Sequence, residues 1–224
     1  MNLRPKTRWL ESTLLVLGVV LLATWSRSFF ESRRFQAAES RRLEIALRGP
    51  RPGPHGSDAD AAAFIGPPAP GEAQRARRTL TLGAGVLGRL EIPRLGIAAM
   101  VAEGTDTRTL RHAVGHVPST ALPGDPGNCS LAGHRDTFLR GLGKVRVDDT
   151  VRVVTLDRTF TYRVEWGMVV EPDRVDVLDS TATRSLTLIT CYPFGFVGHA
   201  PQRFIVRARQ VEAVASAVHG SADN

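Results

Sequence analysis

The 224-residue chain is long enough for one ordinary domain with additional segments, because a single hydrophobic core usually accounts for about 100 to 200 residues. The formal net charge of +7 lies almost entirely before residue 79, and the remainder of the chain is close to neutral. This distribution excludes the usual nucleic-acid-binding domain, in which basic residues form a stripe interleaved with stacking aromatic residues.

The first 30 residues are predicted to form a cytoplasmic tail and a transmembrane anchor. A basic flank is followed by a stretch without charge from residue 12 to 26, which is typical of a segment that enters a bilayer. The stretch is shorter than the roughly 20 residues of a spanning helix, so a cleaved signal peptide is the alternative. Trp9 and Trp25 near its ends, and the lack of a small-x-small cleavage site after it, favour an uncleaved anchor with the bulk of the chain exported.

Two further segments separate this anchor from the folded domain. Residues 31–48 are charged and rich in alanine and other good helix formers, which predicts a solvated helical stalk. Residues 49–80 are dense in Pro, Gly and Ala and poor in large apolar side chains, which is the composition of a flexible linker. The folded domain is predicted at 81–212, followed by a C-terminal tail at 213–224.

Within the folded domain the hydrophobic period changes to two, which indicates half-buried β-strands. Short strands between Gly, Pro and Asp turns favour an all-β barrel or sandwich. Two short helices are predicted, at 105–113 with Thr105 as the cap and at 137–142. The eight predicted strands are 88–92, 97–101, 115–117, 128–133, 151–156, 160–166, 185–191 and 202–209.

The two cysteines occupy different kinds of position. Cys191 closes an apolar strand and is followed at once by Tyr192 and Pro193, so its thiol is expected at a strand end where it can meet a substrate. Cys129 lies inside a strand on the face of Leu131, which predicts a buried thiol. Because the two sulfurs would then lie at different depths, we expect both cysteines to be free, although a disulfide is the usual alternative in an exported protein.

Two other side chains can join a thiol in acyl transfer. His134 follows a predicted strand and a glycine, where an imidazole can project from the rim of a barrel, and Arg203 begins the last strand. Separately each has an ordinary explanation, as a surface histidine or as a salt-bridged edge arginine. Together with Cys191 they supply a nucleophile, a proton carrier and a fixed donor for an oxyanion. The other histidines are given no role.

The chain resembles the sortase family, and class D most closely. The residues that carry the resemblance are LAGHRDTF (131–138), TLITCYPF (187–194), APQRF (200–204), the opening GRLEIPRLGI (88–97) and the turn ALPGDPGN (121–128). The likeness runs from about residue 87 to 209 and leaves out the linker.

The resemblance implies an eight-stranded sortase-type β-barrel in which Cys191, His134 and Arg203 are catalytic. It implies a cysteine transpeptidase that cleaves a C-terminal sorting signal of an exported protein through a Cys191 thioester. The acyl group then passes to an amine of a cell-wall precursor or of a protein lysine. Thr190, Ala132 and Leu131 are expected to bind substrate, and residues 170–184 to border the groove. No metal, cofactor or nucleic-acid partner is predicted.

Two alternatives remain at this stage. The first is another envelope thiol peptidase, although papain-like enzymes place the cysteine before the histidine and the Ser-His-Gly-Cys block of L,D-transpeptidases is absent. The second is an anchored, non-catalytic β-barrel scaffold in which Cys191 is incidental. A redox enzyme is disfavoured because the chain has no Cys-x-x-Cys pair.

Overall fold

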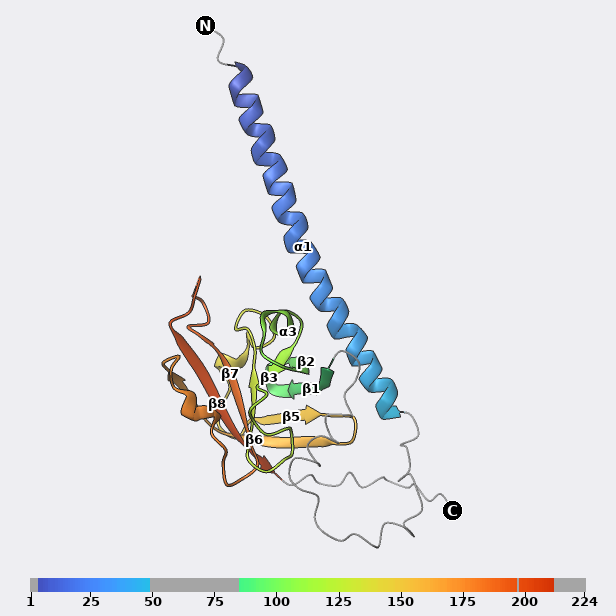
Figure 1. The fold of residues 1–224 in the computed structure, drawn as a ribbon, viewed down its shortest axis with the longest axis vertical. Helices are drawn as coiled ribbons and strands as arrows, with labels where there is room; N and C mark the ends of the chain where they lie inside the picture. Colours follow the sequence, from blue (N-terminus) through green and yellow to red (C-terminus); the bar gives the residue numbers. More distant parts are fainter. Residues whose placement is uncertain (1–3, 49–84, 197, 212–224) are drawn as a thin grey trace.

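The protein is a β-barrel with one long N-terminal helix packed against its side (Figure 1). The computed structural model describes residues 4–48, 85–196 and 198–211. The predicted linker at 49–80 and the predicted tail at 213–224 lie outside these ranges.

Eight strands close into one barrel, in the order β1-β2-β3-β4-β7-β8-β6-β5. The strands β2 and β3, and likewise β4 and β7, are parallel neighbours, and every other neighbouring pair is antiparallel. Each of the eight predicted strands is present, which confirms the barrel. Their bounds are β1 Val86–Ile92, β2 Ile97–Glu103, β3 Val114–His116, β4 Asn128–Ala132, β5 Thr150–Val154, β6 Thr159–Val170, β7 Ser185–Tyr192 and β8 Gln202–Val211.

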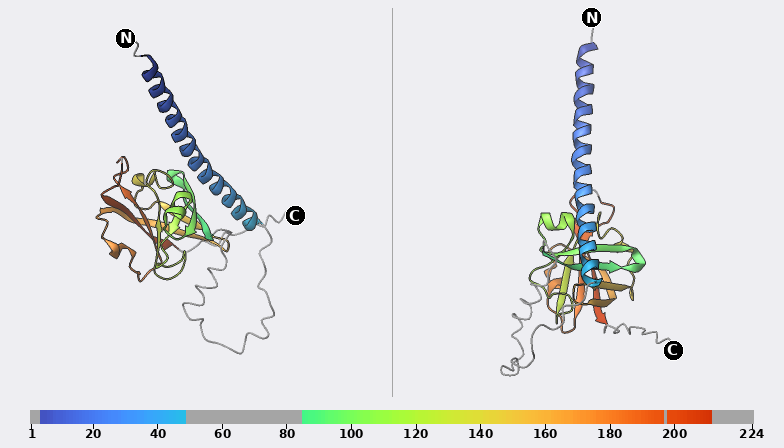
Figure 2. Two further views of the ribbon diagram at one scale, coloured as in Figure 1. Left: turned by 45° about the horizontal axis from the view of Figure 1, so that its top comes forward. Right: turned by 90° about the vertical axis from the view of Figure 1, so that its right-hand side faces the viewer.

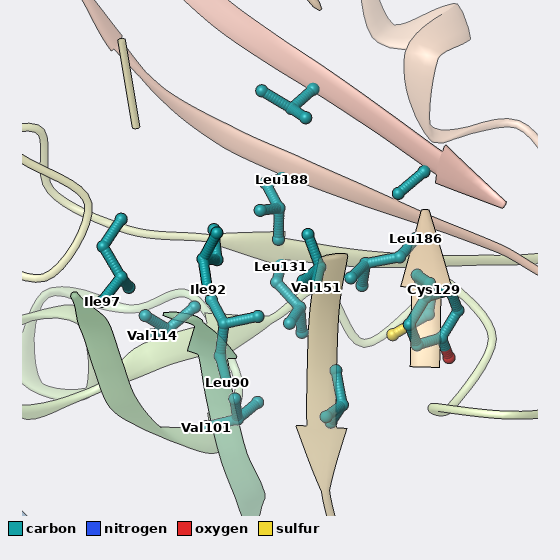
Figure 3. Close-up of a cluster of buried hydrophobic side chains, with 14 of the residues drawn as sticks. Leu90, Ile92, Ile97, Val101, Val114, Cys129, Leu131, Val151, Leu186 and Leu188 are labelled. Carbon is teal, nitrogen blue, oxygen red and sulfur yellow. The ribbon is translucent and has the colours of Figure 1, made fainter. Parts of the chain in front are cut away.

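The interior is filled by alternate residues of the strands, as a period of two requires. Leu90, Leu131, Leu186 and Leu188 have no exposed surface, and Figure 3 shows their side chains in one cluster with Cys129. Burying apolar surface on this scale is the main favourable term in folding, and here it also fixes which face of each strand points outward.

The short helical segments follow the local sequence. Helix α3 (Thr107–His112) begins one residue later than predicted at its cap, because the Asp106 carboxylate accepts hydrogen bonds from the backbone N–H groups of Arg108 and Thr109. The helix predicted at 137–142 is wrong. Residues 135–141 form turns followed by the 3-10 helix η4 (Leu142–Lys144), and glycine at 141 and 143 disfavours a longer helix. Two more 3-10 helices are η3 (Pro93–Leu95) and η5 (Val175–Leu178).

Helix α1 (Arg4–Arg48) is continuous over 45 residues. Its N-terminal half projects beyond the barrel, as both views in Figure 2 show. Large apolar side chains from Leu14 to Leu22 are more than half exposed there. Within the described part of the chain, no helix is both long and apolar enough to cross a membrane.

The C-terminal half of α1 packs on the barrel, which corrects the prediction of a solvated stalk. Leu43 is fully buried against a cluster that includes Val86 and Met100. The Gln36 amide nitrogen donates to the His112 carbonyl at 2.7 Å, and its oxygen accepts from the Met100 N–H at 2.8 Å. Met100 directly precedes Val101, where the pairing of β2 with β3 begins. The Gln36 side chain therefore supplies, next to this pairing, the hydrogen bonds that a neighbouring strand would otherwise supply.

We predict that Gln36→Ala lowers the free energy of unfolding by about 1–3 kcal/mol, because it leaves the Met100 N–H and the His112 carbonyl without their partner. Chemical denaturation monitored by tryptophan fluorescence measures the change. Arg41→Ala is the control, because residue 41 lies on the same helix with an exposed side chain. Equal stabilities of the two variants would contradict the role given to Gln36.

Candidate active site

The three predicted catalytic residues lie in one row at one end of the barrel. In the parallel pairing of β4 and β7, Ala132 lies opposite Ile189. The pairing continues one residue further, because the Gly133 N–H donates to the Ile189 carbonyl at 3.0 Å. His134 follows directly and is therefore brought to the level of Cys191.

Arg203 reaches the same row from the other side of β7. In the antiparallel pairing of β7 and β8, Cys191 lies directly opposite Arg203. Side chains of directly opposed residues point to the same face of a sheet, with Cβ atoms about 4.5–5.5 Å apart. The strand register thus brings His134, Cys191 and Arg203 to neighbouring positions, although they come from three separate parts of the chain.

This row faces the outside of the barrel. Leu186 and Leu188 of β7 point into the core, so Cys191, with the opposite parity, points outward together with Ile189. The Cys191 residue is partly exposed and His134 is exposed, so solvent and a peptide can reach both. In Figure 1 the strands β7 and β8 lie on the side of the barrel away from α1.

Both cysteines are free, as predicted. Cys129 lies opposite Leu186, well below the level of Cys191, and only 1% of its surface is exposed. Burial raises the pKa of the Cys129 thiol far above its ordinary value, because the thiolate would lose its hydration. Cys129 is therefore a core residue, and Cys191 is the thiol that can react.

The Arg203 guanidinium is held at the start of β8 by backbone carbonyls of the residues just before it. Its Nη1 group donates to the carbonyls of Ala200 at 3.2 Å and Gln202 at 2.9 Å. A guanidinium has five N–H donors, and no other described residue accepts from Nε or Nη2. Those two groups are available to a carbonyl or an oxyanion next to Cys191.

The three predicted substrate-binding residues have different positions. Ala132 is half-buried on the outer face beside Ile189, where a peptide can contact it. Leu131 points into the core with no exposed surface, so in this structure it supports β4 from within. Thr190 is also buried, and its hydroxyl donates to the Gly133 carbonyl at 2.8 Å, which ties the turn that bears His134 to the strand that bears Cys191.

A second apolar layer continues the outer face below the row, and the sequence analysis missed it. Ile189 and Ile205 lie opposite each other and pack with Val170 at the end of β6 and with Val177 and Leu178 of the segment between β6 and β7. Residues two apart on a strand point to the same face, so Ile189 could have been predicted from Cys191, and Ile205 from Arg203. Ile189, two residues before Cys191, is partly exposed, whereas Ile205 is buried beneath the segment between β6 and β7.

The segment between β6 and β7 is fixed to this layer at one carbonyl. Asn128 Nδ2 and Arg207 Nη2 each donate to the Val177 oxygen at 3.0 Å. Arg207 is largely buried, and this burial lowers the pKa of its guanidinium. Its guanidinium lies 5.5 Å from the centre of the Trp166 ring, a distance typical of a cation–π contact.

Nothing in the described ranges forms a group of three His, Cys, Asp or Glu side chains that could hold a metal ion. The prediction that the site needs no metal or cofactor is not tested by the geometry. The chemistry available at the row comes from the side chains of Cys191, His134 and Arg203.

The sequence of this domain matches a family model. The model described as the sortase domain matches residues 90–211, which contain the entire row and seven strands together with the last three residues of β1. The chain belongs to the sortase family.

Individual sortases agree with this assignment. Over 125 residues the chain is 35% identical to Sortase D of Bacillus subtilis, which covers 55% of this chain and 63% of that protein. It is 30% identical over 110 residues to Sortase A of Listeria monocytogenes, covering 47% and 49% of the two chains. The solved structure of a Sortase D5 transpeptidase from Clostridium perfringens superposes with a TM-score of 0.55 at 27% identity, covering 65% of this chain and 91% of that one. The match thus spans about half to two thirds of the curated relatives' length.

We predict that native protein reacts with one equivalent of a methanethiosulfonate reagent, at Cys191, because Cys129 is buried and its thiol pKa is raised. Intact-mass and peptide-mass measurements locate the modification. Cys191→Ser should remove the fast reaction, and denaturant should expose a second equivalent in the wild type. Rapid labelling of Cys129 in the folded protein would refute the burial argument.

Proposed function

We propose that this sortase is a cysteine transpeptidase in which Cys191 is the nucleophile. The observation that carries the proposal is the register that sets His134, Cys191 and Arg203 in one outward-facing row. The description of the Clostridium perfringens neighbour as a transpeptidase supports it. A non-catalytic scaffold would have no need for these three groups at one accessible end of the barrel.

In the first half of the reaction the Cys191 thiolate attacks the carbonyl carbon of the scissile peptide bond. Arg203 donates hydrogen bonds to the oxygen as negative charge develops on it. The carbon–nitrogen bond breaks, His134 as imidazolium gives its proton to the departing amine, and a thioester remains on Cys191. In the second half an amine attacks the thioester, its proton passes to neutral His134, and the thiolate is released.

The substrate we propose is an exported protein with a C-terminal sorting signal, commonly of the Leu-Pro-x-Thr-Gly type in this family. The apolar floor formed by the partly exposed side chains of Ala132 and Ile189 leads to the thiol and suits the apolar side chains of such a signal. The acceptor we propose is an amine, either of a cell-wall precursor or of a lysine on another protein.

The test is incubation of the purified full chain with a library of sorting-signal peptides, with and without triglycine, followed by mass spectrometry. We expect peptides joined to triglycine, and in its absence a thioester adduct on Cys191. Cys191→Ala should form neither. Cleavage that yields only hydrolysed peptide in the presence of amine would favour an envelope thiol peptidase, and a wild type identical to Cys191→Ala would favour the scaffold.

Arg203→Lys should lower kcat by about 10²-fold or more while the melting temperature stays close to that of wild type, because a point charge does not reproduce the planar donor array. The matched control is Arg209→Lys on the same strand and face, where Arg209 pairs with Glu165 at 2.9 Å on the surface. Wild-type kcat in the Arg203→Lys variant would remove the arginine from the mechanism.

We also propose that residues 12–26 of α1 hold the protein in a cell membrane with the barrel on the outer side. The basic flank before this uncharged stretch, and the exposed apolar side chains from Leu14 to Leu22, support the proposal. Membranes of expressing cells should retain the full chain through alkaline carbonate extraction, and protease added to protoplasts should digest the barrel. Release of the full chain by carbonate would refute the proposal.

A further inference from the structure

Arg135 connects the turn that bears His134 to the loop between Cys191 and Arg203. Its Nη2 group donates to the Phe196 carbonyl at 2.6 Å and to the Gly198 carbonyl at 2.9 Å. The guanidinium carbon also lies 6.0 Å from the centre of the Phe196 ring. Arg135, the residue after His134, thus holds the loop. This loop begins after Cys191 and ends before Arg203.

The two halves of this loop are held differently. The first half is packed, because the Phe194 ring lies against the Phe204 ring with 5.6 Å between centroids and presses on Gly143. At the tip, Gly195 and Gly198 have no atoms within 4 Å of an ideal Cβ position, and Gly198 has a φ of 95°. Within the described residues, the only backbone–backbone hydrogen bond that reaches this tip is the one from the Phe196 N–H to the Pro193 carbonyl, at 3.3 Å.

We propose that Arg135 is a positioning residue that keeps the tip of this loop closed on the His134 turn, so that the row of three groups stays in register during acyl transfer. The inference rests on the proposed function and extends it to a residue outside the row. With the tip released, the loop gains freedom at both ends, and Cys191 and Arg203 are the residues next to those ends. A displacement of about 1 Å at a reacting centre costs up to about 10²-fold in rate.

The effect should fall on kcat more than on KM. The apolar floor of Ala132 and Ile189 that receives the peptide belongs to β4 and β7, and the Arg135 bonds do not touch it. Both bonds come from one nitrogen, so a lysine ammonium, which also has several N–H donors on one nitrogen, can replace it in part. Arg135→Lys should therefore rescue what Arg135→Met loses, in contrast to Arg203.

The experiment compares Arg135→Met, Arg135→Lys and the control Arg140→Met in the full chain, since residue 140 lies exposed in the same turn segment. We expect Arg135→Met to lower kcat about 10–100-fold with KM changed less than about threefold, and Arg135→Lys to recover most of the loss. Hydrogen exchange should speed up at the Phe196 amide, which donates to the Pro193 carbonyl, in the methionine variant only. Arg140→Met should match wild type in both measurements.

Wild-type kcat in Arg135→Met would overturn the proposal, and so would a lower kcat without faster exchange at the loop tip. The exchange measurement needs no substrate. If the wild type transfers no peptide, the proposed function fails on its own, and unchanged exchange in Arg135→Met separately refutes the role of the arginine in holding the loop.

Discussion

The backbone hydrogen bonding of β7 to its neighbours β4 and β8 is the constraint on which the rest of the site depends. Side chains alternate between the two faces of a strand, so a slip of one residue would turn Cys191 into the core and Thr190 out of it. The inward residues Leu186 and Leu188 prevent such a slip, because each position is completely buried. The hydrophobic core therefore does more than stabilise the barrel: it selects the face on which the thiol appears.

The strands and the row could be predicted because their signals are local. Strands with one face in the core alternate apolar and polar residues, and the blocks around His134, Cys191 and Arg203 resemble a known family. The layer around Ile205 was missed because Ile205 shares its face of β8 with Arg203 and Arg207, so that face resembles a solvent-exposed one. The docking of α1 had no local signal either, because Gln36 is bonded to the backbone of Met100, 64 residues further along the chain.

The outer layer combines apolar packing with a buried polar contact. The Val177 carbonyl accepts from both Asn128 and Arg207, and a buried carbonyl with two donors resists displacement, because losing them would leave several polar groups unpaired. The segment that crosses the outer face between β6 and β7 is thus held at Val177, and also by hydrogen bonds from Gln202 to Glu171 at 2.8 Å and from Arg184 to the Gly124 carbonyl at 2.9 Å, while residues 171–176 are exposed. Substitutions in the exposed part can change this surface without disturbing the packing of Val177 on Ile205.

The packing of α1 on the barrel fixes the direction in which the rest of the long helix extends. An α-helix of 45 residues measures roughly 70 Å, and its free half extends past the end of the barrel at which β8 begins (Figure 1). Leu43 and Gln36 attach the C-terminal half of α1 to β2. Anything that binds the first two dozen residues therefore also sets the position and orientation of the Cys191 thiol. A flexible connection would leave the barrel free to reorient, whereas this packing holds the barrel in one orientation relative to α1.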